Sequence, residues 1–280
     1  MLNEQEVVMP FFSRLSMVIL VASMIFLPNL LADARADDLK AREIMEKVDS
    51  RDDGDNQRAD MEMVLIDKSG KERFREIRTF SKDMEADTFR LMFFVSPADV
   101  KHTGFLTYDY ADPEKDDDQW LYLPALKKTK RIASSDKSGS FMGSDLNYSD
   151  MTSRNLADYD FSLKDELDVY GHPAWLIESV PRTKKVIKET GYSKSFLFVR
   201  QDNFYVIRAI HWVKDSGELK YVDVKRLEQI DGIWVGTEMH VFKKKGNAIV
   251  HRTELRWENI QFNQKIEDEL FTIRRLEKGL

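Results

Sequence analysis

The residues best suited to acid–base or metal chemistry are spread thinly along this 280-residue chain. None of the five histidines belongs to an HExxH motif or to a pair four residues apart; they are His102, His172, His211, His240 and His251. His211 and His240 fall in segments expected to be strands and could meet in a sheet. A single strand histidine is more often a hydrogen-bonded face residue than a ligand, so we expect no metal centre here.

One acidic run invites a calcium interpretation, because residues 49–60 read DSRDDGDNQRAD. Aligned on Gly54, an EF-hand loop needs an oxygen ligand at position 51, which is Arg, and prefers Glu at position 60, which is Asp. A strand pattern follows where the loop needs a helix, so the run does not predict a calcium site.

Nucleophile motifs are equally weak. Gly143-Ser144-Asp145 lacks the strand–turn–helix context of a nucleophile elbow, and no Gly-rich phosphate loop is present. Asp165 and Glu166 are adjacent in a strand pattern, so they point to opposite faces and cannot act as a pair. These absences predict no catalytic residues, no metal and no cofactor, although a hydrolase that uses a Ser or Asp of the 140–151 segment, such as Ser144, stays open as an alternative.

Composition narrows the class of protein further. Hydrophobic residues make up 42% of the chain and charged residues 33%, which permits a sizeable core and excludes a membrane-embedded body. The net charge is −6 with both signs interleaved, so we expect no nucleic-acid partner. The chain has no cysteine, which excludes disulfides, thiolate sites and a lipid-modified N-terminal Cys.

The N-terminus has the pattern of an export signal. Arg14 precedes an apolar run from Leu15 to Leu27, and Ala34-Arg35-Ala36 matches an A-x-A cleavage site. An uncleaved anchor is the alternative, but the run is shorter than the roughly 20 residues of a spanning helix. We therefore predict a signal peptide over residues 1–36, cleaved near Ala36, and a mature domain over 37–280 in the periplasm.

The mature chain predicts one helix and then almost continuous period-two alternation. The helix covers 37–51, where Leu39, Ile44, Met45 and Val48 share one face. Strands are predicted, with Gly- and Asn-containing turns between several of them, at 59–67, 72–82, 87–97, 104–110, 116–124, 129–134, 158–170, 173–181, 194–200, 204–213, 219–230, 233–242 and 248–260. A short helical turn is expected in the tail.

Sequential hairpins form an antiparallel meander, and more than about ten strands cannot stay flat. The sequence thus predicts a single mainly β (α+β) domain whose sheet of about ten to twelve strands curls into an open barrel. One substantial helix cannot cover all the apolar surface of such a sheet, so a pocket is expected on the concave face.

Residues 140–161, SFMGSDLNYSDMTSRNLADYDF, interrupt this pattern. The stretch is rich in Gly, Ser and Asp yet carries large apolar groups, which favours a lid across the mouth of the curl; a rigid connection is the alternative. We expect Ser149-Asp150 to cap a short helix that runs to about Asn155. The predicted cavity and lid residues are Phe93, Trp120, Tyr122, Phe141, Met142, Tyr148 and Trp212.

The path from Trp120 to Met151, WLYLPALKKTKRIASSDKSGSFMGSDLNYSDM, resembles the signature of the outer membrane lipoprotein-sorting protein family, a LolA-like group. The shared features are W-x-Y-x-P, a Lys-rich turn before Arg131-Ile132, and F-x-G-S-D-x-x-Y-x-D. The resemblance implies a half-open antiparallel β-barrel with a helical lid and an apolar cavity. It also implies lipid or lipid-modified cargo, sometimes beside RND-type exporters.

Together these features predict a non-enzymatic periplasmic carrier that binds acyl chains of lipoproteins or lipids and helps sort them to the outer membrane. Its expected partners are those acyl chains, a membrane in transient contact and an inner-membrane RND-type transporter. The alternative is a non-catalytic adaptor or scaffold whose concave face is fully packed and whose edge strands bind an RND-type transporter.

Overall fold

The computed structural model describes residues 37–280, so the predicted signal peptide and its cleavage site at Ala36 lie outside the described residues. None of the helices in the described part is both long and apolar enough to cross a membrane.

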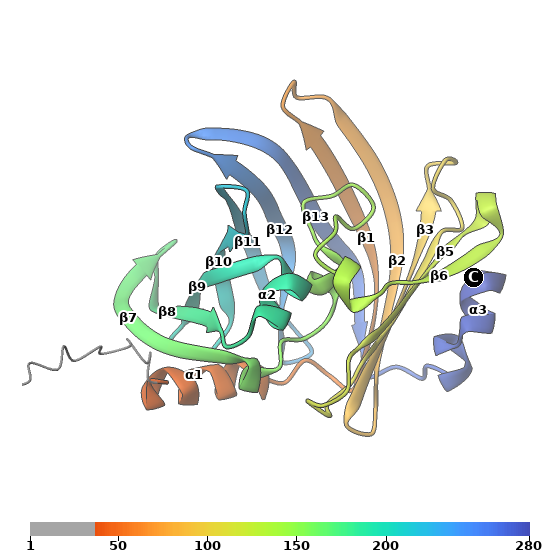
Figure 1. The fold of residues 1–280 in the computed structure, drawn as a ribbon. Helices are drawn as coiled ribbons and strands as arrows, with labels where there is room; N and C mark the ends of the chain where they lie inside the picture. Colours follow the sequence, from red (N-terminus) through yellow and green to blue (C-terminus); the bar gives the residue numbers. More distant parts are fainter. Residues whose placement is uncertain (1–36) are drawn as a thin grey trace, which may run out of the picture. The chain divides into compact units, whose positions relative to one another are not determined.

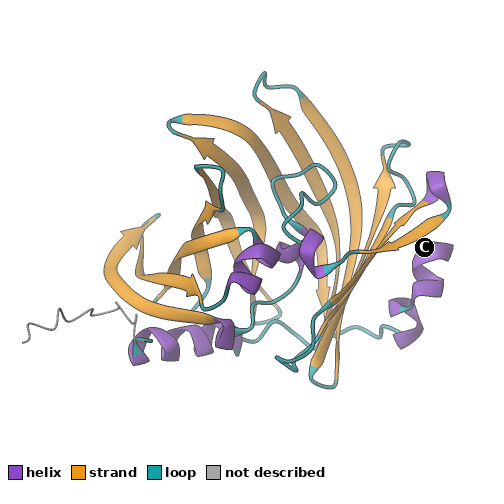
Figure 2. Cartoon of the chain, in the orientation of Figure 1, coloured by secondary structure: helices purple, strands orange, loops and turns teal. Residues whose placement is uncertain are grey.

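Thirteen antiparallel strands form one sheet that curls without closing (Figures 1 and 2). The first half is a meander of β1 (Asn56–Asp67), β2 (Glu72–Met84), β3 (Asp87–Ser96), β4 (Gly104–Asp109), β5 (Asp118–Leu123) and β6 (Lys128–Arg131). The second half comprises β7 (Tyr159–Val169), β8 (His172–Pro181), β9 (Tyr192–Arg200), β10 (Val206–Val213), β11 (Glu218–Ile230), β12 (Ile233–Lys245) and β13 (Ala248–Phe262).

The two meanders join in the middle of the sheet, because the first strand pairs with the last. Met63 of β1 lies opposite Leu255 of β13, and the strand order runs from β6 to β1 and then from β13 back to β7. Strands β6 and β7 are therefore the two outer edges. The chain between them has to cross the open side of the curl.

Helix α1 (Leu39–Asp49) confirms the predicted N-terminal helix. The side chain of Asp38 caps it by accepting hydrogen bonds from the amides of Lys40 and Ala41. Its apolar face packs against the β7–β9 end of the sheet through Ala41, Ile44 and Met45. The helix closes the lower end of that half (Figure 1).

Two further helices cover different faces of the sheet. Helix α2 (Lys184–Thr190), which the sequence analysis did not predict, lies on the concave side beside the chain that crosses it (Figure 2). Helix α3 (Ile273–Lys278), close to the expected helical turn of the tail, lies on the outer side of β3–β5.

Alternation along the strands gives the β1–β5 half two separate apolar layers. Neighbouring residues go to opposite faces, so Phe94 joins the concave layer while Phe93 joins the outer one. The outer layer is closed by Phe271 and Leu276, which are 1% and 0% exposed. What closes the concave layer is the irregular chain between β6 and β7.

Candidate functional site

Residues 132–158, here named the crossing segment, run from edge strand β6 to edge strand β7 over the concave face (Figure 1). The segment contains only short 3-10 turns and one isolated bridge between Ser140 and Asn147. The helix expected to start at Ser149-Asp150 is instead a 3-10 turn from Tyr148 to Met151. It is capped by Asn147, and Asp150 occupies the third helical position of a capping box.

Phe141 is the apolar anchor of this segment and is 0% exposed. Its ring centroid lies 5.0 Å from that of Phe105, 6.2 Å from that of Phe94 and 5.7 Å from that of Tyr148. The layer beneath it consists of Met61, Met63, Leu65, Ile77, Phe94, Phe105, Leu121 and Leu255. The segment thus covers a layer of apolar strand residues with one fully inserted aromatic ring.

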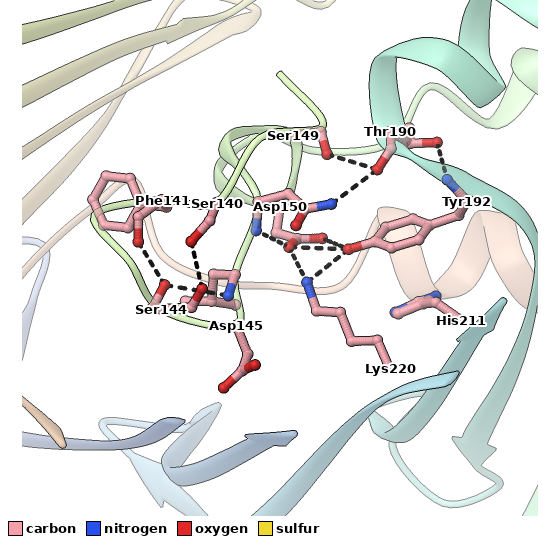
Figure 3. Close-up of polar contacts among 12 residues, drawn as sticks. Ser140, Phe141, Ser144, Asp145, Ser149, Asp150, Thr190, Tyr192, His211 and Lys220 are labelled. Atoms are coloured by element: carbon pink, nitrogen blue, oxygen red, sulfur yellow. Dashed lines mark hydrogen bonds and ion pairs between the residues drawn. The ribbon is translucent and has the colours of Figure 1, made fainter. Parts of the chain in front are cut away.

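Asp150 ties the segment to the other half of the sheet through a buried ion pair (Figure 3). The ammonium of Lys220, which is 0% exposed, donates to Asp150 Oδ2 at 2.5 Å and to the Tyr192 hydroxyl oxygen at 2.6 Å. The Tyr192 hydroxyl in turn donates to Asp150 Oδ1 at 2.9 Å. Burial alone would raise the pKa of Asp150, but the Lys220 cation outweighs it and holds the pKa below 3.8.

Asp145 makes a second attachment, to β13. Its carboxylate Oδ2 lies 2.6 Å from Nδ1 of His251 and accepts a hydrogen bond from the Thr253 hydroxyl at 2.9 Å. Its backbone amide donates to Thr253 Oγ1 at 2.9 Å. Because Asp145 is 2% exposed and Thr253 is 0% exposed, this contact is sealed from solvent.

Three further polar contacts hold the segment down. Arg75 of β2 donates to the carbonyl of Met142, and Gln119 of β5 donates to the carbonyl of Tyr148 at 2.8 Å. Lys137, also almost fully buried, pairs with Glu189 of α2 at 2.8 Å. The crossing segment is therefore attached by charged and polar groups at both halves of the sheet.

The structure separates the seven predicted cavity and lid residues into three places. Phe141, Met142 and Tyr148 lie with the concave layer. Phe93, Trp120 and Tyr122 lie together on the outer side beneath α3. Trp212 packs edge-to-face against Phe196, with ring centroids 4.9 Å apart, on the face opposite to that of its neighbour His211.

Sequence analysis missed the strand partners that hold the segment, namely Lys220, Tyr192, His251, Thr253 and Arg75. One signal was available for Lys220: in the strand LKYVDV it shares a face with Val222 and Val224. A lysine on an otherwise apolar face requires a buried partner, which here is Asp150 of the crossing segment.

His211 and Ser195 form another buried pair on the concave face, with His211 Nδ1 at 2.8 Å from the serine hydroxyl. Burial holds the pKa of His211 well below 6.5, so the imidazole is neutral at physiological pH. His240 lies on the opposite face, where it contacts Glu238, so the two histidines do not meet.

A cavity of about 700 Å³ lies between residues 149–158 of the crossing segment, the 109–117 turn and α2. Its lining contains eleven carboxylates, among them Asp109, Asp117 and Glu189, but only four cationic side chains. Burial, and after it the charge of Asp109, raises the pKa of Asp117. The described part of the chain nevertheless holds no group of three or more His, Asp or Glu side chains arranged as metal ligands. This hollow suits polar or cationic groups and does not suit a hydrocarbon chain.

Comparison with known proteins identifies the family. A family model described only as that of an uncharacterized protein matches residues 86–278. A crystal structure of a DUF1329 family protein from Desulfovibrio piger is 31% identical, with a TM-score of 0.77 over 85% of this chain and 98% of that chain. No curated protein sequence matched.

Two other solved structures extend the comparison. An outer membrane lipoprotein-sorting protein domain from Vibrio parahaemolyticus is 29% identical, with a TM-score of 0.77 over 85% of this chain and 98% of that chain. A LolA superfamily protein from Nitrosomonas europaea shares the fold at 19% identity, with a TM-score of 0.63 over 84% and 98%. The expected resemblance is therefore confirmed: the chain belongs to the DUF1329 family and has the LolA-like fold of outer membrane lipoprotein-sorting proteins.

Proposed function

We propose that this protein is a periplasmic, non-enzymatic carrier that takes up an acyl chain of a lipoprotein or lipid on its concave face. The crossing segment lifts to admit the chain and closes again when the chain leaves for an acceptor membrane. Similarity to a lipoprotein-sorting domain supports the cargo class.

The observation that carries the proposal is the way in which the concave layer is covered. An apolar layer that includes Met63, Leu65 and Phe105 is closed by a segment with two buried apolar side chains, Phe141 and Ile132, while its other apolar side chains are only partly buried. An acyl chain gains roughly 0.8 kcal/mol for each buried CH₂ group. It can therefore replace the contacts of Phe141, while Asp145 and Asp150 recover their hydration outside the layer.

Under this proposal Phe141, Met142 and Tyr148 contact the cargo, together with the apolar strand residues beneath them. Phe93, Trp120, Tyr122 and Trp212 remain predicted binding residues of the other face, which a ligand would have to reach from outside the curl.

A reversible lock tests the proposal. Because the native chain has no cysteine, the double variant Asp145→Cys/Thr253→Cys can form only one intramolecular disulfide, between groups that already touch. A fluorescent long-chain fatty acid should bind delipidated protein in the reduced form. Oxidation should weaken that binding by at least about tenfold, because the segment then cannot lift.

The single variant Asp145→Cys is the control, since it loses the carboxylate but cannot be locked. Equal binding by the oxidised and reduced double variant would contradict uptake beneath the segment. Absence of binding by every form, including the delipidated native protein, would contradict the carrier function itself.

The packed state of the concave layer favours a second candidate, the non-catalytic adaptor that binds an RND-type transporter. Phe141 already fills the space over β1–β5, and edge strands β6 and β7 can add a partner strand. Native mass spectrometry of freshly extracted protein separates the two functions, because an adaptor carries no lipid.

A further inference from the structure

A second hollow, of about 350 Å³, adjoins the crossing segment at Ser135, Ser138 and Asn147. Four lysines and no carboxylate line it, and the lysines are Lys188, Lys214, Lys220 and Lys243. Its volume lies at the lower end of the range found for small-molecule sites. The charge of its lining is the reverse of that in the larger, carboxylate-rich cavity.

The register of the sheet explains why cations gather there. Lys220 of β11 lies directly opposite Lys243 of β12, and Lys243 lies directly opposite His251 of β13. Like charges placed opposite one another on one face destabilise a sheet. Burial lowers the pKa of Lys220, and the charge of Lys243 lowers it further although Asp150 acts in the opposite direction.

Carboxylates compensate only part of the positive charge in the row formed by Lys220, Lys243 and His251. Asp150 pairs with Lys220 and Asp145 contacts His251, and Asp67 is the cross-strand neighbour of His251 on β1. Lys214 lies 3.5 Å from the exposed Asp215. Among residues 37–280, neither Lys243 nor Lys188 has a carboxylate within ion-pair distance. Two cationic groups at one hollow thus lack an anion.

Hydrogen-bond donors accompany the charge. The ammonium of Lys220 is 0% exposed and donates to Asp150 and Tyr192, so Lys220 adds positive charge beside the hollow without contacting a ligand in it. The hydroxyl-bearing Ser135 and Ser138 line the same hollow. Lysines act as point-charge binders of phosphate, and hydroxyls complete the coordination of its oxygens.

We propose that this hollow binds a phosphate-type oxyanion, held by Lys188 and Lys243 together with the hydroxyls of Ser135 and Ser138. The group is either inorganic phosphate or the phosphate of a lipid headgroup. The lipid source deepens the proposed carrier function and rests on it, whereas the free anion does not.

Calorimetric titration at low ionic strength with two probes, inorganic phosphate and a short-chain phosphatidylglycerol, tests this assignment. The double variant Lys188→Gln/Lys243→Gln should weaken the binding of whichever probe binds by at least about tenfold, because two charge-assisted contacts are lost. The matched control Lys245→Gln, an exposed lysine at the β12–β13 turn outside the hollow, should leave binding unchanged.

The two probes distinguish the sources. Phosphatidylglycerol that binds at least about tenfold more tightly than phosphate assigns a lipid headgroup, and comparable binding of both assigns a free oxyanion. A site that keeps phosphate while the protein fails to bind fatty acid would end the carrier proposal but not this one.

A second readout needs no variant. Phosphate added to isotope-labelled native protein should shift the backbone amide resonances of Ser138 and Gly191, which line the hollow, and not that of Gly70 in the β1–β2 turn. The assignment is overturned by absence of binding of both probes at millimolar concentration, or by binding that the double variant leaves intact.

Discussion

Two covers lie on opposite sides of the same strands, and they are held by different forces. On the outer side, Leu276 of α3 and Phe271, which precedes the helix, close an apolar layer, and the ion pair between Lys82 and Asp268 beside them lies at the surface. On the concave side, the crossing segment inserts Phe141 and adds buried attachments at Asp145 and Asp150.

The difference teaches which cover can be released. Apolar groups pack because they leave water, so separating them exposes apolar surface that finds no compensating partner in solution. A buried ion pair loses much of its attraction to the cost of desolvation, and its charges are well solvated once they separate. We therefore infer that α3 is a permanent part of the core and that the crossing segment is the cover suited to opening.

The largest expected effect comes from breaking the buried ion pair. Lys220→Met leaves the Asp150 carboxylate buried without a cation, so we expect the free energy of unfolding to fall by about 3–5 kcal/mol. Urea unfolding measures the loss. Amide exchange of Phe141 and Tyr148 reports whether the segment opens first.

The double variant Lys220→Met/Asp150→Leu should recover most of that stability, because it removes both charges. Lys225→Met, on the same strand but with a partly exposed side chain, should cost less than about 1 kcal/mol. If the double variant were as unstable as the single one, the lost stability would not come from a buried carboxylate left without its cation.

The apolar cover should respond differently. Leu276→Ala removes a fully buried side chain from α3 and should lower the free energy of unfolding by about 2–5 kcal/mol. Amide exchange in the crossing segment should stay unchanged below the global unfolding limit. Ile273→Ala on the same helix, where the side chain is 40% exposed, is the matched control and should have a small effect.

The smallest expected effect is a dependence on pH. Folded His211 stays neutral because burial lowers its pKa, whereas the unfolded chain binds a proton below pH 6.5. Proton binding therefore favours the unfolded state. The free energy of unfolding should fall by about 1.4 kcal/mol for each pH unit below 6.5 until the pKa of folded His211 is reached. Asp150, with a pKa below 3.8, keeps its ion pair through this range.

Urea unfolding between pH 7 and pH 5 checks this slope. The paired variant His211→Leu/Ser195→Ala should flatten it, because no buried histidine remains to titrate, while His172→Gln at an exposed position should leave it intact. A slope that survives in the paired variant would assign the acid sensitivity to other groups.

Local patterns in the sequence accounted for most of the fold. The side-chain alternation in DTFRLMFFVS and in IWVGTEMHVF predicted strands β3 and β12. The turns at Gly70 and Gly232 predicted the β1–β2 and β11–β12 hairpins. Helix α2 was missed, because KKVIKET is too short to show a helical period. Its conformation depends on Val186 packing into the core near α1.

The binding site stays a prediction, but the segment that crosses the concave face could be recognised from the sequence. The motif with Phe141, Asp145 and Asp150 marked the irregular segment, but the partners of that segment come from strands far along the chain: Lys220 is 70 residues from Asp150 and Thr253 is 108 residues from Asp145. Phe93 and Trp120 were grouped with the segment because aromatic residues on period-two strands look alike on either face.

By itself the sequence determined the strands, their hairpins and the irregular connection, because side-chain alternation and turn residues act over a few neighbouring positions. Only the tertiary structure decided that β1 pairs with β13, which makes β6 and β7 the edges and sends the connection across the concave face. That pairing joins residues nearly two hundred positions apart, as between Met61 and Trp257. It depends on how the whole sheet twists and packs, which no local pattern records.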